Sequence, residues 1–196
     1  MSYISRRRFL QSALICGMML GANLSVFLNK ATLAGGRDDT SQMDFTVLIN
    51  ALHSTGNAFC LKLAEKLEAS RGSKAEYDLH LRKADLGVSD AQIIASAIRK
   101  VSLNKGPALR SFSMSYNPGL TDTGVVALAL AFPYTVTELG FVKCAIGDEG
   151  GAALLRWCKR ATELRMICVE GNNFSSRIRQ GFTALAQTKP HLLVVV

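Results

Sequence analysis

The chain has 196 residues and a formal net charge of +8, from 23 Lys and Arg against 15 Asp and Glu. The length allows one ordinary domain with a small extension, and the 48% of hydrophobic residues excludes a chain that is disordered throughout. Five cysteines are too few and too scattered for a disulfide-dense miniprotein. The positive charge is typical of nucleic-acid binders, but its place in the chain decides what it means.

The first 34 residues have the parts of an export signal. Three arginines at residues 6–8 precede an uncharged apolar run over residues 9–28, and Thr32 and Ala34 are small residues before a cleavage point. The order Ser-Arg-Arg-x-Phe-Leu resembles the bacterial twin-arginine (Tat) signal, which implies recognition by the Tat translocase. Gln11 departs mildly from that motif. The matching residues are Ser5, Arg6, Arg7, Phe9 and Leu10.

Two fates of residues 1–34 stay open. Cleavage after Ala34 would release the rest of the chain into the periplasm of a Gram-negative bacterium. Retention would attach it to the inner membrane through residues 9–28, because about 20 apolar residues can span a bilayer. Arg6, Arg7, Arg8 and Lys30 carry four of the positive charges, so the other 19 basic and 15 acidic residues leave a net charge of +4. Export and this modest excess predict no nucleic-acid partner.

Polar residues 35–43 form a predicted linker. The segment of residues 44–73 is predicted to form one or two helices over residues 44–70, with a break at residues 54–57. Because solenoids need terminal caps, we expect this segment to be the N-terminal helical cap of a repeat domain over residues 74–196. Helical spacing occurs at Phe45, Leu48, Ile49 and Leu52, and again at Phe59, Leu63 and Leu67.

The repeat domain is indicated by apolar residues followed by Asn or Cys, with steps of 27 and 28 residues from Asn117 to Cys144 and from there to Asn172. A degenerate earlier copy begins at Leu79. Alternation of apolar residues predicts a short strand with one buried face in each copy. The three clear copies are Leu109-x-x-Phe112-x-Met114, Val136-x-x-Leu139-x-Phe141 and Leu164-x-x-Ile167-x-Val169.

This pattern resembles the long leucine-rich repeat of ribonuclease-inhibitor-like proteins, in which Asn and Cys share the ladder position at the end of the strand. The resemblance covers residues 76–196 and departs at residues 118–119, where one extra residue enters. It implies an α/β fold, a short leucine-rich-repeat solenoid of about four βα repeats. It also implies a role in protein binding.

A helix is expected after each strand. Asp90, Asp122, Asp148 and Ser176 fall in one column before a helical pattern, so each is predicted to be an N-cap. The apolar faces of these helices must be buried by stacking of neighbouring repeats. They comprise Ile93, Ile94, Ala97 and Ile98; Val125, Leu128 and Phe132; Leu154, Leu155 and Cys158; and Ile178, Phe182 and Leu185.

Catalytic and metal-binding patterns are not found. No HExxH, GxSxG, CxxC or phosphate-loop motif is present, and the three histidines have no ligand spacing. We therefore expect no enzyme activity and no cofactor. Cys144 is predicted to be a buried ladder thiol and Cys158 a core residue, with Cys168 on an outward strand position. The cysteine spacing does not indicate a disulfide.

The variable strand positions are expected to project from the sheet on its concave side, which is the predicted partner-binding face. This face is basic at one end and partly apolar at the other, which favours an acidic or mixed protein surface as partner. Its candidate contact residues are His80, Arg82, Lys83, Arg110, Ser113, Ser115, Tyr116, Glu138, Val142, Lys143, Met166, Cys168 and Glu170.

A truncated fifth copy begins at Leu192 and Val195, 28 residues after Leu164 and Ile167. An apolar strand with an uncovered edge invites pairing, so we expect this edge to dock a partner or a second copy. The contact residues there are Leu193, Val194, Val195 and Val196.

The function that these features favour is an exported, non-enzymatic protein-binding scaffold. An alternative is an accessory small subunit of a Tat-exported, membrane-associated redox enzyme, whose larger subunit would be the partner. Phe45, Leu48 and Leu52, followed by Thr55 and Gly56, look faintly like the helical start of small subunits of membrane sugar dehydrogenases. The repeats depart from that family. An enzyme with an unrecognised site is the third interpretation.

Overall fold

The computed structural model describes residues 45–70 and 75–196. The expected export signal, its cleavage point, the apolar run over residues 9–28 and the linker lie outside these residues. Helices and strands alternate from residue 76 onward. The elements are α2 (Thr46–Ser54), α3 (Ala58–Glu68), β1 (Glu76–His80), α4 (Val88–Leu103), β2 (Ala108–Ser113), η1 (Pro118–Leu120), α5 (Thr121–Ala131), β3 (Glu138–Gly140), α6 (Asp148–Arg160), β4 (Met166–Cys168), α7 (Ser176–Thr188) and β5 (Leu193–Val195).

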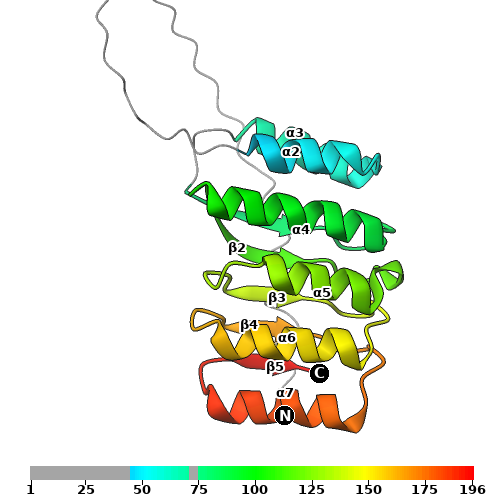
Figure 1. Cartoon of the computed structure of the whole chain (residues 1–196), viewed down its shortest axis with the longest axis vertical. Helices are drawn as coiled ribbons and strands as arrows, with labels where there is room; N and C mark the ends of the chain where they lie inside the picture. Colours follow the sequence, from blue (N-terminus) through cyan, green and yellow to red (C-terminus); the bar gives the residue numbers. More distant parts are fainter. Residues whose placement is uncertain (1–44, 71–74) are drawn as a thin grey trace, which may run out of the picture. The chain divides into compact units, whose positions relative to one another are not determined.

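The five strands form one parallel sheet in the order β1-β2-β3-β4-β5. Helices α4 to α7 lie side by side on one face of this sheet (Figure 1). Each of β1 to β4 is followed by a helix that returns the chain to the start of the next strand, as parallel pairing requires. The predicted α/β class and the short leucine-rich-repeat solenoid are confirmed.

The core lies between the sheet and the helices. One column of paired, inward-facing strand residues runs through the whole sheet, and a fully buried aromatic cluster fills the middle repeats. In that cluster the Phe112 ring lies 4.7 Å from the Phe132 ring and 5.8 Å from the Phe141 ring, centroid to centroid. The column consists of Leu79, Phe112, Leu139, Ile167 and Val194.

The predicted helical pair is present, with α2 and α3 separated by residues 55–57. Asn57 holds the break in place, because its side chain accepts hydrogen bonds from the backbone of Phe59 and Cys60 as the N-cap of α3. Its amide also donates to the carbonyl of Ala84 at 2.6 Å, which ties the pair to the first repeat. The domain boundaries at residues 44 and 74 stay predictions.

The ladder positions are confirmed, and they explain how neighbouring repeats are joined. Asn117 is fully buried. Its Oδ1 accepts from the backbone N–H of Ala84 and Leu86 at 3.0 and 3.1 Å, and its Nδ2 donates to the carbonyls of Leu81 and Met114 at 2.8 and 2.7 Å. Each ladder Asn therefore satisfies the turn of the preceding repeat, as buried backbone groups require.

Asn172, two repeats after Asn117, makes the same four hydrogen bonds, whereas Cys144 in the repeat between them does not. The Cys144 thiol lies 3.3 and 3.4 Å from the carbonyl oxygens of Met114 and Val142. The turn before it contains Pro118, which has no N–H, and the N–H of Leu120 is already bonded to the carbonyl of Asn117. The turn with the extra residue therefore has fewer free N–H groups for a side-chain acceptor, which allows a thiol at the ladder position.

The predicted N-caps are wrong. The N-cap residues are Gly87, Leu120, Gly147 and Ser175, and two of the carboxylates act on the following repeat. Asp122 accepts from the backbone N–H of Gly147 and Gly150 at the start of α6. The repeat spacing shows the column but not which helix each carboxylate serves.

Asp148 acts in the same way, because it accepts from the backbone N–H of Ser175 at 2.8 Å. Hydrogen bonds from the side chain and backbone of Ser175 hold the pKa of Asp148 below its ordinary value. The carboxylate thus keeps this contact until the pH falls through its lowered pKa. Asp90 serves its own helix instead, accepting from the N–H of Gly87.

The register expected for the fifth copy is also wrong by one residue. Ile167 pairs with Val194 rather than Val195, and Val195 pairs with Cys168 on the outer side of the sheet. The turn before β5, closed by the hydrogen bond from Leu192 N–H to the carbonyl of Lys189, shortens the final step. Leu192 is buried, as its place at the start of the copy predicts.

Lys189 closes the C-terminal end of α6 from the next repeat. Its Nζ donates to the carbonyls of Cys158 and Ala161 at 2.7 and 2.8 Å, which the negative end of the helix dipole favours. Replacing Lys189 by Met is expected to lower the free energy of unfolding by about 1.5 kcal/mol. Urea unfolding measures this, and Lys159→Met, an exposed change on α6, is the matched control. Equal losses in both variants would contradict the capping role.

Candidate partner-binding surface

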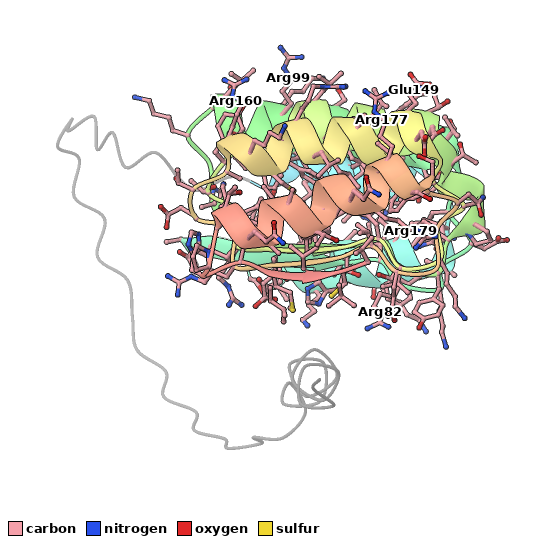
Figure 2. The ribbon with its side chains drawn as sticks, turned by 90° about the horizontal axis from the view of Figure 1, so that it is seen from below. Arg82, Arg99, Glu149, Arg160, Arg177 and Arg179 are labelled. Atoms are coloured by element: carbon pink, nitrogen blue, oxygen red, sulfur yellow. The ribbon has the colours of Figure 1, made fainter. Side chains whose placement is uncertain are left out.

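The side of the sheet that faces away from the helices, called the sheet face below, carries two columns of side chains. Figure 2 shows this face below the strands and the helices above them. Both columns change from polar to apolar between β1 and β5. The first column is Asp78, Ser111, Glu138, Met166 and Leu193, and the second is His80, Ser113, Gly140, Cys168 and Val195.

The structure corrects the expectation that Ser113 and Ser115 are contact residues, because both are fully buried. Ser113 Oγ donates to Ser115 Oγ, which in turn accepts from the backbone N–H of Val142 at 3.1 Å. These hydroxyls join β2 to the next repeat. Val142 and Cys168 are also largely buried, at 8% and 9% exposure, so they offer only part of a side chain to a partner.

Arg110 is placed apart from the other predicted cations. It lies on β2 and forms ion pairs with the carboxylates of Glu76 and Asp78 on β1. Its charge is therefore matched within the chain. Arg82 and Lys83, by contrast, lie in the turn that follows β1, at the opposite ends of the strands. The single basic end expected for this face is therefore divided, with Arg110 at one end of the strands and Arg82 and Lys83 at the other.

His80, Ser111 and Glu138 form a hydrogen-bonded chain across three strands. Ser111 Oγ donates to Glu138 Oε2 at 3.2 Å and lies 2.8 Å from His80 Nε2. Because the hydroxyl proton lies toward Glu138, Nε2 of His80 is the donor in its own hydrogen bond. In that tautomer the imidazole cannot take a proton from Ser111, and the serine is itself buried. The geometry is that of a structural network rather than a Ser–His nucleophile.

The pKa of His80 is lowered, chiefly by burial, and the carboxylates of Asp78 and Glu138 partly oppose this shift. A lowered pKa keeps the imidazole neutral at neutral pH. The sheet face near β1 therefore carries its positive charge on Lys and Arg side chains alone.

Tyr116 gathers three of those cations. The charged groups of Arg82, Lys83 and Lys143 lie 5.4, 5.2 and 5.8 Å from the centre of its ring, within cation–π range. Figure 2 shows Arg82 on the sheet face, while Arg99, Arg160 and Arg177 extend from the helix layer. The Tyr116 cluster, as it is called below, consists of Tyr116, Arg82, Lys83 and Lys143. Its residues come from three successive turns at the C-terminal ends of β1, β2 and β3.

The other end of the sheet face is apolar. Met166 and Val195 are half-buried there, and Leu193 is 42% exposed. Glu138 lies between this apolar end and β1, and Glu170 follows β4. The expectation that Val194 is a contact residue is wrong, because it faces the helices in the inward column and packs against the core. With Ser113, Ser115, Arg110 and Val194 set aside, the other expected contact residues lie on one surface with a cationic end and an apolar end.

Every cysteine in the described part of the chain is a buried free thiol. These residues are Cys60, Cys144, Cys158 and Cys168. Burial raises the pKa of Cys144, and it raises the pKa of Cys158 to about 12 and that of Cys168 to about 11. Compared with an ordinary thiol pKa of 9.0, this raised pKa lowers the thiolate fraction of Cys168 at pH 8 by about a hundredfold. We expect iodoacetamide to label Cys168 at least about tenfold more slowly in the folded protein than in the protein unfolded by urea. Mass spectrometry with site mapping measures this, and equal rates would contradict the burial.

A groove on the helix side was not predicted. It lies between α2 and α4 and has a volume of about 610 Å³. Its walls include Val47 and Ala51 from α2 and Ile93 and Ala97 from α4. A second apolar stripe on α2, at Val47 and Ala51, was the available signal in the sequence.

Among residues 45–70 and 75–196, no three His, Cys, Asp or Glu side chains are grouped as a metal site would require. In the same part of the chain, no helix has the length and apolar character needed to cross a membrane.

Comparison with known proteins supports the class that the fold defines. A family model described as Leucine Rich repeat matches residues 107–129 and 135–155, which contain β2 with most of α5 and β3 with most of α6. These matches support a leucine-rich repeat protein. Proteins of this kind are generally non-enzymatic binding scaffolds, and they typically bind other proteins. No curated protein matches the chain.

Proposed function

We propose that this protein is an exported, non-enzymatic scaffold of the ribonuclease-inhibitor-like type that binds another protein through its sheet face. The observation that carries the proposal is the sheet face itself, which is uncovered by helices and changes from cationic to apolar along the solenoid. Such continuous faces are the binding surfaces of repeat proteins.

The free edge of β5 extends this surface. Among the described strands, β5 pairs with β4 on one side and with none on the other. Its Leu193 and Val196 side chains are exposed. A partner strand added there would gain backbone hydrogen bonds beside the apolar end of the sheet face.

Export is the part of the proposal that rests on the sequence alone. Ser5, Arg6, Arg7, Phe9 and Leu10 match the Tat motif, which supports a periplasmic location, with cleavage after Ala34 or attachment to the inner membrane through residues 9–28. Arg6→Lys together with Arg7→Lys is expected to keep the protein in the cytoplasm of a Gram-negative host. Cell fractionation and N-terminal sequencing measure location and cleavage, and unchanged export in this variant would contradict a Tat signal.

Binding is tested by cross-linking and pull-down from native membranes and periplasm with quantitative mass spectrometry. Met166→Glu places a charge on the apolar end of the sheet face, and Leu130→Glu places the same charge on the helix side, where Leu130 is 77% exposed. An identified partner should be lost with the first variant and kept with the second. Loss in both or in neither would contradict binding through the sheet face. A flavin or haem enzyme as the partner would make the protein an accessory subunit.

A further inference from the structure

We infer that the sheet face recognises an acidic segment of the partner protein, whose carboxylates lie at the Tyr116 cluster and whose apolar side chain lies against β4 and β5. This inference rests on the proposed function and specifies the chemistry of the partner. It is carried by the placement of two lysines, by the charges around them and by the apolar end of the same face.

The lysines are held in place by the backbone. Lys83, Tyr116, Lys143 and Gly171 occupy the same turn position in four successive repeats, and all have left-handed φ angles of 53°, 64°, 52° and 73°. The glycine makes room for the neighbouring lysine, because a Cβ at Gly171 would lie 2.7 Å from Cγ of Lys143. The stem of Lys143 therefore lies across the next turn, while its ammonium group reaches Tyr116.

Among the described residues, Lys83 and Lys143 form no ion pair, whereas Arg110 is paired with Glu76 and Asp78. Both lysines are exposed. Two ammonium groups beside one ring repel each other, and the ring quadrupole does not neutralise them. A carboxylate between them would remove this repulsion, and the exposed position leaves room for one.

The acids elsewhere on the face favour a protein partner over a polyanion. Glu138 lies in the first column, so a phosphate backbone or an anionic membrane laid over the whole face would meet like charge there. A peptide can present a carboxylate at one end and an apolar side chain at the other. The face thus selects a segment of mixed character.

The distance between the two ends sets the spacing in that segment. Tyr116 follows β2, and the apolar end lies at β4 and β5, which is two to three strand spacings of about 4.8 Å away with an added offset along the strands. An extended chain that rises about 3.3 Å per residue covers this in roughly four to six residues. The apolar residue is therefore expected that far along the chain from the acidic ones.

The inference is tested with a displayed library of random peptides of about 12 residues, which is selected on the immobilised full chain. We expect enrichment of Asp or Glu at a spacing of about four to six residues from Leu, Ile, Val or Phe. A selected peptide should bind the double variant Lys83→Glu and Lys143→Glu at least about tenfold more weakly than it binds the unchanged protein. Its binding to the unchanged protein should weaken in high salt. The matched control is Lys62→Glu with Lys159→Glu, which reverses two exposed charges outside the face. Urea unfolding confirms that both double variants are folded.

The outcomes separate this inference from the proposed function. Selected peptides without acids, or with affinities that the Lys83 and Lys143 changes leave intact, overturn the inference while the scaffold role stands. Vesicles of phosphatidylserine that bind through these lysines, where acidic peptides do not, overturn it in favour of a lipid surface. A library that yields no binder overturns the inference, and the proposed function fails with it if Met166→Glu also leaves the native partner bound.

Discussion

Replacing Asn117 by alanine is expected to lower the free energy of unfolding by about 4 kcal/mol, because it removes four hydrogen bonds to buried backbone groups, two N–H groups and two carbonyls. The N–H groups belong to Ala84 and Leu86, and the carbonyls to Leu81 and Met114. The side chain is fully buried, so water does not replace the lost bonds. Asn172→Ala should behave similarly.

Urea unfolding followed by circular dichroism measures these losses. The matched control is Asn173→Ala, since Asn173 is an exposed neighbour of Asn172 and only its backbone N–H bonds the preceding repeat. It should change the unfolding free energy by less than about 0.5 kcal/mol. A loss of that small size in Asn117→Ala would contradict the ladder interpretation.

The second large effect is expected at Gly150, where α6 comes close to Asp122. A Cβ added there would lie 2.6 Å from Cγ2 of Ile146, 2.7 Å from Oδ1 of Asp122 and 3.2 Å from the Asp122 Cα. Gly150→Ala should therefore displace the carboxylate that caps α6 and lower the unfolding free energy by about 3 kcal/mol.

Gly181→Ala is the control for this change. Gly181 is also inside a helix, but the tightest contact of its added Cβ is with Cδ1 of Leu155, the far end of a flexible side chain, at 2.8 Å. The higher helix propensity of alanine should leave stability unchanged or raise it by up to about 1 kcal/mol. The same unfolding experiment measures both variants, and equal losses would show that contact with Asp122 does not matter.

Much of the fold could be predicted because each repeat states the same pattern again. Phe112, Leu139 and Ile167 alternate with outward residues in successive copies, so the strands and their parallel pairing follow from periodicity. The ladder Asn and Cys were found in the same way. Agreement among copies gives this pattern more weight than a single strand would have.

Contacts between repeats could not be predicted from the column of acids. Asp122 and Asp148 stand directly before helical patterns, and the local rule assigns such residues to their own helix. In the structure each turns to the helix of the following repeat, because the repeats stack within hydrogen-bond reach. The register of β5 was missed for a related reason, since the turn at Lys189 shortens the last step by one residue.

The surface was predicted in composition but not in detail. Strand alternation places Met166 and Leu193 on the sheet face, yet it does not show that Ser113 and Ser115 are covered. Nor does strand alternation predict that Arg110 pairs with acids on β1, or that Lys83 and Lys143 lie at Tyr116. Those distinctions depend on side-chain direction at the ends of short strands, where the period of two no longer holds.

The direction of the bonds between repeats decides where this chain can be cut or extended. Asn117 and Asn172 reach back to the preceding turn, whereas Asp122 and Asp148 reach forward to the next helix. A boundary placed between two repeats therefore removes a partner from both sides at once. The smallest piece that keeps its polar groups satisfied is a junction of two repeats, so shuffled or shortened versions are best joined within a repeat, between the ladder residue and the helix that follows it.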